Sequence, residues 1–203
     1  LSLKDFNLRS RIAELAEAGI TSFKIEGRLK NESYVRNVVR DYSIALDELV
    51  ARCPETYERG SYGQVSGGFT PDTAKTFNRG YTELYIDGKR GKWASMDAAK
   101  SMGEEIGQVV SLNKDKSSVG LKLVRKDIVL NNGDGFSFVG KDSSVNGFRG
   151  DVCSGNSIRC KSTPSLYVGA KIFRNINIAF EKEIERKACT REIRAVVSMD
   201  FIK

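Results

Sequence analysis

The sequence predicts an α+β protein in which α/β units precede a small antiparallel β-barrel or sandwich. Two observations lead to this class. A helix, a strand and a longer helix follow one another over residues 8–51, which is typical of an α/β unit. After residue 103, short segments of alternating pattern are separated by turns rich in Gly, Asn and Asp, which is typical of small all-β domains.

Two helices are predicted in the first quarter of the chain. The first covers residues 8–19, with Ser10 as its N-cap and Gly19 as the residue that ends it. The second covers residues 31–51 and begins at the N-cap Asn31. Its apolar residues recur every three or four positions, which predicts one buried face. They are Val35, Val38, Val39, Tyr42, Ala45, Leu46 and Leu49.

Residues 53–102 are predicted to form an irregular but packed connector. The segment is rich in Gly and aromatic residues and has no helical period. Its apolar content is too high for a disordered linker. The apolar residues that we expect to be packed are Phe69, Phe77, Tyr81, Leu84, Tyr85 and Ile86.

A small β-barrel is predicted over residues 103–188, and residues 189–203 are expected to start a further, truncated segment. The predicted strands cover residues 106–110, 119–124, 136–139, 147–149, 157–160 and 171–174. A helix is predicted over residues 177–187, and residues 191–199 alternate as if they opened another strand. Because the chain starts at Leu1 and stops in this alternating segment, we expect it to be the C-terminal part of a longer protein.

Composition excludes several classes of protein. The 203 residues include no His, which excludes a Ser-His-Asp or Cys-His hydrolase and a His-ligated zinc site within this chain. No apolar run could span a bilayer, so no membrane partner is expected. The net charge of +7 is spread along the chain. It permits contact with RNA or another polyanion without establishing it.

The cysteines are Cys53, Cys153, Cys160 and Cys189, too few for a disulfide scaffold and without a C-x-x-C pair. We therefore expect reduced thiols and a cytoplasmic protein. Cys153 and Cys160 flank a turn that contains Gly, so they could pair or share a metal. Two thiols on neighbouring strands is the favoured interpretation, and no metal or cofactor is predicted in this chain.

The first candidate site is Lys24-Ile-Glu-Gly-Arg28, at the end of a strand predicted over residues 20–26. Alternation puts Lys24 and Glu26 on one face, and Arg28 follows the strand. In an α/β barrel the carboxyl ends of the strands build the active site. Lys24 and Arg28 would bind an anionic substrate there, and Glu26 would be the catalytic carboxylate. The equally weighted alternative is an exposed ion pair on an edge strand.

The second candidate site is Phe77-Asn-Arg-Gly-Tyr-Thr82. Asn78 and Arg79 could bind a phosphate, a carboxylate or RNA, with Tyr81 stacking on a base. The alternative is a structural turn in which Gly80 has a positive φ and the aromatic residues fill a core. The structural turn is somewhat favoured over the binding site.

Three blocks of the sequence resemble the collagenase-like peptidases, peptidase family U32, in their order and spacing. The blocks are Ser2-Leu-Lys-Asp-Phe6, Ile20-Thr-Ser-Phe-Lys-Ile-Glu-Gly-Arg-Leu-Lys30 and Phe77-Asn-Arg-Gly-Tyr81. Residues 100–187 resemble, more loosely, the small β-barrel that follows the family's catalytic domain. The resemblance implies that residues 1–52 are the end of an incomplete TIM-type barrel.

The resemblance also implies a peptidase that acts on a peptide or polymeric substrate, with the missing N-terminal part of the parent protein as a partner. Other members serve in hydroxylation of ribosomal or transfer RNA or of ubiquinone precursors, several with a four-cysteine iron–sulfur cluster. The RNA-modifying members depend on prephenate. The family's cysteine signature is absent from this chain, and Asn7 stands where cluster-bearing relatives have a ligand cysteine. No cluster is therefore predicted.

Three functions stay open from the sequence. The first is a collagenase-like peptidase, although the absence of His counts against ordinary hydrolysis by this part of the protein. The second is prephenate-dependent RNA hydroxylation. The third is a non-catalytic module whose β-barrel binds RNA or peptide. A basic face with exposed aromatic residues on the barrel would favour the third.

Overall fold

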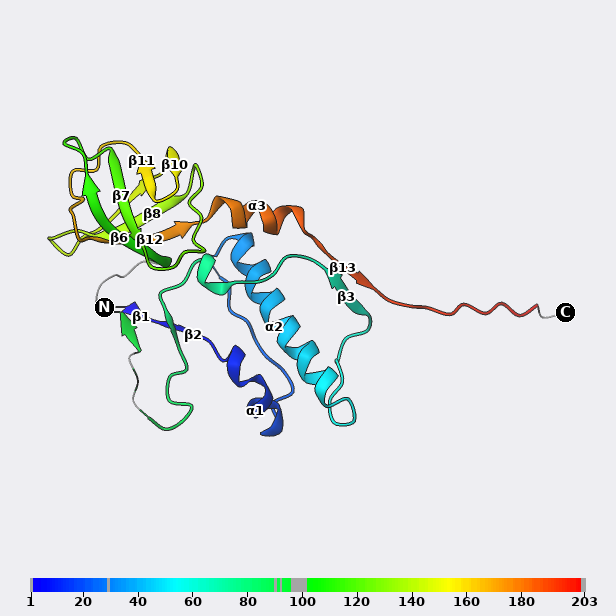
Figure 1. The fold of residues 1–203 in the computed structure, drawn as a ribbon. Coiled ribbons are helices and arrows are strands. Elements are labelled where there is room, and N and C mark those ends of the chain that lie inside the picture. Colours follow the sequence, from blue (N-terminus) through cyan, green and yellow to red (C-terminus); the bar gives the residue numbers. More distant parts are fainter. Residues whose placement is uncertain (1, 29, 90, 92, 96–101, 202–203) are drawn as a thin grey trace.

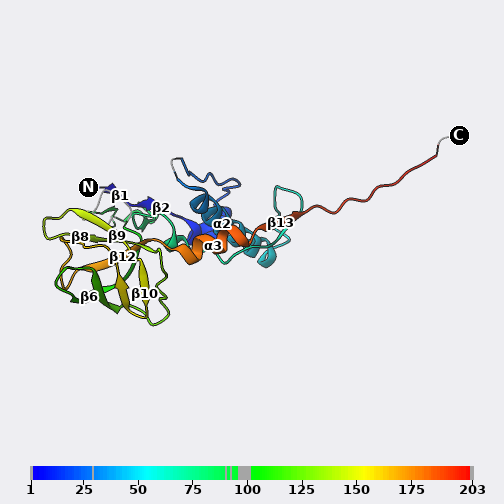
Figure 2. The same cartoon turned by 90° about the horizontal axis from the view of Figure 1, so that it is seen from above.

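The computed structural model describes residues 2–28, 30–89, 91, 93–95 and 102–201. The chain has the predicted α+β class, because a curled antiparallel sheet lies beside a part dominated by one long helix (Figure 1). Seen from above, the sheet lies at one end of the molecule and the helices in the middle. The last described residues extend away from the other end (Figure 2).

Seven strands form the curled sheet, all paired antiparallel in the order β10-β11-β7-β6-β12-β8-β9. They are β6 Glu104–Leu112, β7 Ser118–Leu123, β8 Gly135–Val139, β9 Val145–Arg149, β10 Val152–Ser154, β11 Ser157–Arg159 and β12 Lys171–Ile176. A strand was predicted at each of these places except β10. That strand is too short for an alternating pattern to stand out.

The core of the sheet consists of apolar side chains that are almost completely buried. Alternate strand residues supply it, for example Val119 and Leu121 of β7, because successive side chains point to opposite faces. Each large side chain contributes ~1.5–3 kcal/mol on burial. The members are Ile106, Val109, Val119, Leu121, Ile128, Leu130, Phe136, Phe138, Ile158, Cys160, Leu166, Ala170 and Ile172.

The sheet is an open half-barrel, where the sequence predicted a small antiparallel β-barrel or sandwich. Its edge strands, β9 and β10, are not paired with each other in the described part of the chain. Between them, the Gly150 N–H donates to the Asp134 carbonyl and the Asp151 N–H donates to the Arg159 carbonyl. The Gly150 N–H thus bonds beside β8, and the Asp151 N–H bonds beside β11. The chain therefore passes from one edge of the sheet to the other without a ladder of hydrogen bonds between β9 and β10.

The long helix α2, Glu32–Arg52, confirms the prediction over residues 31–51. The Asn31 side chain accepts a hydrogen bond from the Tyr34 N–H, as expected of its N-cap. The predicted apolar stripe is wider than the face that is covered, since Val35 and Val39 are 40% and 46% exposed. The buried residues of α2 are Asn37, Val38, Ala45 and Leu49.

The helix predicted over residues 8–19 is shorter than expected. A 3₁₀ turn, Arg9–Arg11, leads into α1, Ile12–Glu17. Ser10 is not an N-cap, because its hydroxyl donates to the Glu83 carboxylate at 2.9 Å. Gly19 follows the helix with φ +89°, a conformation that glycine adopts without strain.

The strand predicted over residues 20–26 is absent from the structure. A strand needs a neighbouring backbone for its hydrogen bonds, and none of the described strands pairs with this segment. The alternation that prompted the prediction persists in the burial pattern. Phe23 and Ile25 are half-buried, whereas Lys24 and Glu26 are exposed.

The connector contains four short elements: β3 Gln64–Gly67, the 3₁₀ turn η2 Thr73–Lys75, β4 Tyr81–Thr82 and β5 Ala94–Ser95. Phe69 is buried, as predicted. Leu84, Tyr85 and Ile86 are 39%, 54% and 40% exposed, and the Tyr85 ring packs against Trp93 with the ring centroids 4.2 Å apart. Residues 96–101 of the predicted connector lie outside the described residues.

Helix α3, Ile178–Arg186, confirms the helix predicted over residues 177–187. Its Phe180 and Ile184 pack with Phe69 of the connector, and the two phenyl rings meet edge to face at 5.9 Å. The strand β13, Cys189–Glu192, then pairs with β3. It corresponds only to the beginning of the strand predicted over 191–199. None of the described helices has the length and apolar character that a membrane span requires.

Candidate functional site

Two blocks from distant parts of the sequence lie side by side. Strand β2, Asp5–Phe6, runs parallel to β4, and Asp5 is the register partner of Tyr81. The turn that precedes β4 therefore lies against β2, although 74 residues separate Asp5 from Arg79. This contact joins the block at Ser2–Phe6 to the block at Phe77–Tyr81.

The Arg79 side chain forms an ion pair with Asp5. Its Nη2 lies 2.7 Å and its Nε 3.2 Å from Oδ1 of Asp5, and its backbone N–H donates to Oδ2 at 2.8 Å. Asp5 is mostly buried, with 17% of its side chain exposed. Charge-assisted bonds from a planar fork fix both side chains. The guanidinium thus holds the turn onto β2.

The Asn78 side chain bonds within its own turn. Its Nδ2 donates to the carbonyl oxygens of Thr76 at 3.0 Å and Ala74 at 3.2 Å, and its Oδ1 accepts from the Gly80 N–H at 3.1 Å. Gly80 has φ +78°, the conformation that the structural alternative required. These contacts are those of a structural turn, and this turn forms one wall of a pocket.

Lys30 brings the third block to the same place. Its Nζ lies 3.1 Å from the centroid of the Phe77 ring and 5.8 Å from that of Tyr34, which is cation–π geometry. Burial lowers the pKa of Lys30, while the charge of Asp5 raises it and that of Arg79 lowers it further. The three blocks that carry the family resemblance therefore form one cluster.

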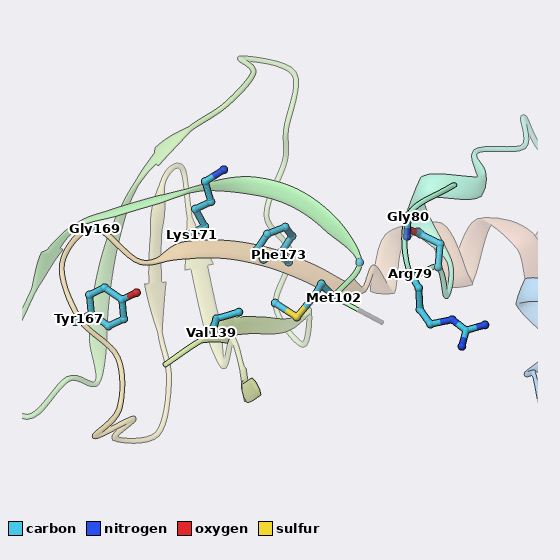
Figure 3. Close-up of a pocket in the computed structure, with 10 residues that line it drawn as sticks. Arg79, Gly80, Met102, Val139, Tyr167, Gly169, Lys171 and Phe173 are labelled. Atoms are coloured by element: carbon cyan, nitrogen blue, oxygen red, sulfur yellow. The ribbon is translucent and has the colours of Figure 1, made fainter. Parts of the chain in front are cut away.

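A pocket of about 430 Å³ opens between this turn and the half-barrel (Figure 3). Its lining residues are Asn78, Arg79, Gly80, Met102, Gly103, Val139, Tyr167, Gly169, Lys171 and Phe173. Tyr167, Phe173 and Lys171 come from the half-barrel, and the Arg79 side chain points away from them (Figure 3). None of the described lining residues is acidic. The volume is within the range of small-ligand sites.

Two lysines stand near the aromatic wall of this pocket. Lys171 lies 3.1 Å from a carboxylate oxygen of Glu105, and the two side chains are 63% and 40% exposed. An exposed ion pair of this kind is weak, so an anionic ligand can compete for Lys171. The Nζ of Lys141 lies 5.3 Å from the centroid of the Tyr167 ring.

Lys24, Glu26 and Arg28 stand apart from the pocket. Lys24 Nζ lies 2.7 Å from Glu26 Oε1, so the two side chains share a side as the alternation predicted. They are 86% and 72% exposed, and their ion pair raises the pKa of Lys24. Arg28 is exposed as well. None of the three lines the pocket, so the two predicted groups of site residues are not brought together.

The four cysteines lie in three different parts of the described structure. Cys53 follows α2 and Cys189 opens β13, whereas Cys153 and Cys160 lie in the half-barrel, and all four are free thiols. Asn7 accepts two hydrogen bonds within the chain through its Oδ1. Across the described ranges, no three Cys, His, Asp or Glu side chains gather as metal ligands would.

The half-barrel side of the pocket was not predicted from the sequence. Tyr167 and Lys171 flank a short turn before β12, and an isolated Tyr and Lys at this spacing match no binding motif. Asp5 belongs to a block that carried the resemblance, but its ion pair with Arg79 depends on tertiary contact. Only the clustering of the three family blocks could have been inferred from the sequence.

Comparison with known proteins agrees with this arrangement. The sequence model described as Peptidase family U32 matches residues 1–95, which contain all three blocks. Residues 1–95, just under half of the chain, are therefore similar to peptidase family U32. The resemblance seen in the sequence is thereby confirmed.

The curated relatives carry names of two kinds. Over 157 residues the chain is 36% identical to the 23S rRNA 5-hydroxycytidine C2501 synthase of Escherichia coli, an alignment of 75% of this chain and 22% of that protein. Over 94 residues it is 36% identical to a collagenase of Porphyromonas gingivalis, an alignment of 46% of this chain and 24% of that protein. Over 125 residues it is 30% identical to the tRNA hydroxylation protein P1 of Bacillus subtilis, an alignment of 60% of this chain and 28% of that protein. The chain thus spans less than a third of each relative, and no solved structure matches it.

Proposed function

We propose that the chain is part of a U32-family protein that takes part in the hydroxylation of RNA, the prephenate-dependent activity implied by the family resemblance. The observation that carries this proposal is the extent of the similarity to the rRNA hydroxycytidine synthase. An alignment of 157 residues cannot fit within residues 1–95, so it extends beyond the U32 segment. The match to the collagenase covers 94 residues, about the length of that segment, whereas the match to a protein named as an uncharacterized protease covers 137 residues at 31% identity.

The chemistry of the chain also supports RNA over peptide hydrolysis. The chain contains no His, so its thiols lack the imidazole base that activates a nucleophilic Cys. Burial raises the pKa of Cys153 to about 11 and also raises the pKa of Cys160, which disfavours the reactive thiolate. The pocket has aromatic and cationic lining residues, which suit bases and phosphates.

A peptidase is the second candidate function. The identity to the collagenase equals the identity to the rRNA synthase, 36% in each case. Within the U32 segment, similarity therefore does not separate the two activities. A direct assay of both activities is needed.

For the full-length protein we propose that residues 20–26 are a strand of an incomplete TIM-type barrel, whose neighbouring strands would come from the rest of the protein. Lys24 and Arg28 would then hold an anionic group, and Glu26 would be the catalytic or orienting carboxylate beside it. The exposure of Lys24 and Glu26 in this chain, 86% and 72%, leaves them accessible for such contacts. Asn78 and Arg79 are proposed to contribute to substrate binding by shaping the pocket.

The test compares full-length Glu26→Ala with Glu17→Ala, a matched substitution of an exposed carboxylate on α1. Each variant is expressed in the host from which its own copy has been deleted, and nucleosides of ribosomal and transfer RNA are measured by mass spectrometry. Both purified proteins are also assayed for cleavage of gelatin. We expect a hydroxylated nucleoside that Glu17→Ala restores and Glu26→Ala does not, without cleavage by either protein.

Other results would change the proposal. Gelatin cleavage that Glu26→Ala abolishes, with unchanged RNA, would replace RNA hydroxylation by the peptidase. A nucleoside restored equally by both variants would keep RNA hydroxylation but remove Glu26 from the site.

A further inference from the structure

We propose that the pocket between the Asn78–Gly80 turn and the half-barrel binds one unpaired nucleotide of an RNA strand. This inference rests on the proposed function, because it names the place where the chain would hold the RNA. The pocket of about 430 Å³ has room for a ligand the size of one nucleotide. On the half-barrel side, its lining includes two aromatic residues, Tyr167 and Phe173, together with Val139 and Lys171 (Figure 3).

The aromatic wall supplies the stacking surface. Tyr167 and Phe173 are half-buried, so each ring is fixed by its packing and still presents area to the pocket. The Tyr167 hydroxyl points toward the other lining side chains (Figure 3), where it can hydrogen-bond to a base or a ribose. Stacking on a fixed ring favours an unpaired base, because a base inside a duplex already stacks on its neighbours.

The charge around the pocket selects an anion. Lys171 lines the pocket, and Lys141 lies over the Tyr167 ring at 5.3 Å. The carboxylate on Lys171 belongs to Glu105, in an exposed pair that a phosphate can displace. No acidic side chain is found among the described residues that line the pocket. Two lysines beside a stacking ring match the phosphates that flank a base better than they match a neutral peptide.

The pocket offers little for reading the identity of the base. The donors of Asn78 are bonded within its own turn, and the Gly80 carbonyl accepts from the Asp5 N–H. The Arg79 guanidinium is held by Asp5. Binding should therefore depend on single-strandedness and charge, with little dependence on sequence.

The test uses the full 203-residue chain and a short fluorescein-labelled oligouridine, with binding followed by fluorescence anisotropy. We expect Tyr167→Ala to weaken binding about tenfold, as for the loss of one stacked base. Tyr167→Phe should bind like the unmodified chain because it keeps the ring. The matched control is Tyr62→Ala, which removes a Tyr that is 86% exposed and does not line the pocket.

Salt dependence tests the lysines separately. Lys171→Gln and Lys141→Gln should each lower the slope of log affinity against log salt by about 0.7, the value for one phosphate contact on a single strand. Lys182→Gln, an exposed lysine on α3 that does not line this pocket, should leave the slope unchanged. A slope that is the same in all variants would overturn the role of the lysines.

Cross-linking gives a reading that does not depend on a substitution. An oligonucleotide that carries 4-thiouridine should cross-link to the peptide that contains Tyr167 or Phe173 when it is irradiated with the unmodified chain. Cross-links elsewhere, equal binding of an RNA duplex, or full affinity in a folded Tyr167→Ala variant would each overturn the proposal. If RNA binding needs Tyr167 but the host RNA shows no hydroxylation, only the proposed function fails. If hydroxylation is present and Tyr167 is dispensable for binding, only the present inference fails.

Discussion

At the scale of single residues, two side chains that suggested ligand binding serve to fold the chain. Arg79 pairs with Asp5, and Asn78 closes the turn on η2. Both residue types bind phosphates in other contexts, so composition alone could not separate the two roles. The deciding observation is the carboxylate 74 residues away, which only the tertiary structure brings into reach.

The most strongly buried charges form a network around Arg174. Its Nη2 lies 2.9 Å from Glu104, its Nη1 lies 3.3 Å from Asp134, and the three side chains are 5%, 8% and 0% exposed. Asp134 also accepts a hydrogen bond from the Ile178 N–H at the start of α3. The network therefore joins β6, β12 and α3.

We predict that Arg174→Met lowers the free energy of unfolding by about 3–5 kcal/mol, because it removes the guanidinium from the buried Asp134 carboxylate, whereas Glu104 keeps its ion pair with Arg125 at 2.7 Å. Lys187→Met is the control, since it removes an exposed pair with Glu183 and should cost less than ~0.5 kcal/mol. Urea denaturation of the full chain measures both. Equal effects of the two substitutions would contradict the importance of the network.

The half-barrel thiols should react slowly. Burial raises the pKa of Cys153 to about 11, so only about one thiol in a thousand is ionised at pH 8. Iodoacetamide at pH 8 should therefore label the exposed Cys53 and Cys189 before Cys153, as followed by peptide mass spectrometry. First labelling at Cys153 would contradict this.

The same shift predicts how stability depends on pH. The pKa of Cys153 is higher in the folded chain than its ordinary value of 9.0, so its stabilising contribution is complete below pH 9. It should be lost as the pH rises from 9 to about 11. Cys153→Ser should make the free energy of unfolding fall less steeply with pH in this range. If the fall is unchanged in this variant, other titrating groups cause it.

At the scale of elements, the sequence predicted best those elements that are specified by nearby residues. The N-cap Asn31 and the spacing of apolar residues define α2 without help from the rest of the chain. The strands of the half-barrel are likewise predicted from nearby residues, by their alternating apolar and polar pattern. The failed strand over 20–26 needed a backbone neighbour, and the open edge of the half-barrel depends on hydrogen bonds between distant strands. Neither is encoded in a local pattern.

Gly103, at the entrance to β6, is the element-scale position most sensitive to a side chain. It has φ +82°, and an added Cβ would clash with the carbonyl oxygen of Arg174. We predict that Gly103→Ala costs at least about 3 kcal/mol, from the positive φ and the clash together. Gly155→Ala is the control, with φ +54° and nothing within 4 Å, and should cost about 1 kcal/mol. Thermal and urea unfolding distinguish these outcomes, and equal costs would contradict the close approach.

At the scale of the whole molecule, α3 connects the half-barrel to the long helix. Phe180 and Ile184 of α3 pack with Phe69, and the side chain of Ser33 on α2 donates to Glu181 of α3. The pocket lies between the connector turn and the half-barrel, so its shape depends on this connection. The sequence predicted the turn side of the pocket, through Asn78 and Arg79, but not Tyr167 and Lys171 on the opposite wall. No local pattern reports which strand end faces that turn.

We predict that Phe180→Ala weakens this connection and costs about 3–5 kcal/mol, since a ring that is 4% exposed is removed from its packed site. Hydrogen exchange should then show less protection in α3. Phe201→Ala is the matched control, because that ring is 96% exposed. A similar loss of stability in both variants would contradict the role of α3.

The central claim, that the protein takes part in RNA hydroxylation, is tested most directly in the host. Ribosomal and transfer RNA from cells with and without the intact coding sequence are digested to nucleosides and compared by mass spectrometry. We expect that one nucleoside heavier by a single oxygen atom disappears on deletion and returns when the full-length protein is restored. Identical nucleoside profiles, with gelatin cleavage by the purified protein, would contradict the claim and assign the chain to a peptidase.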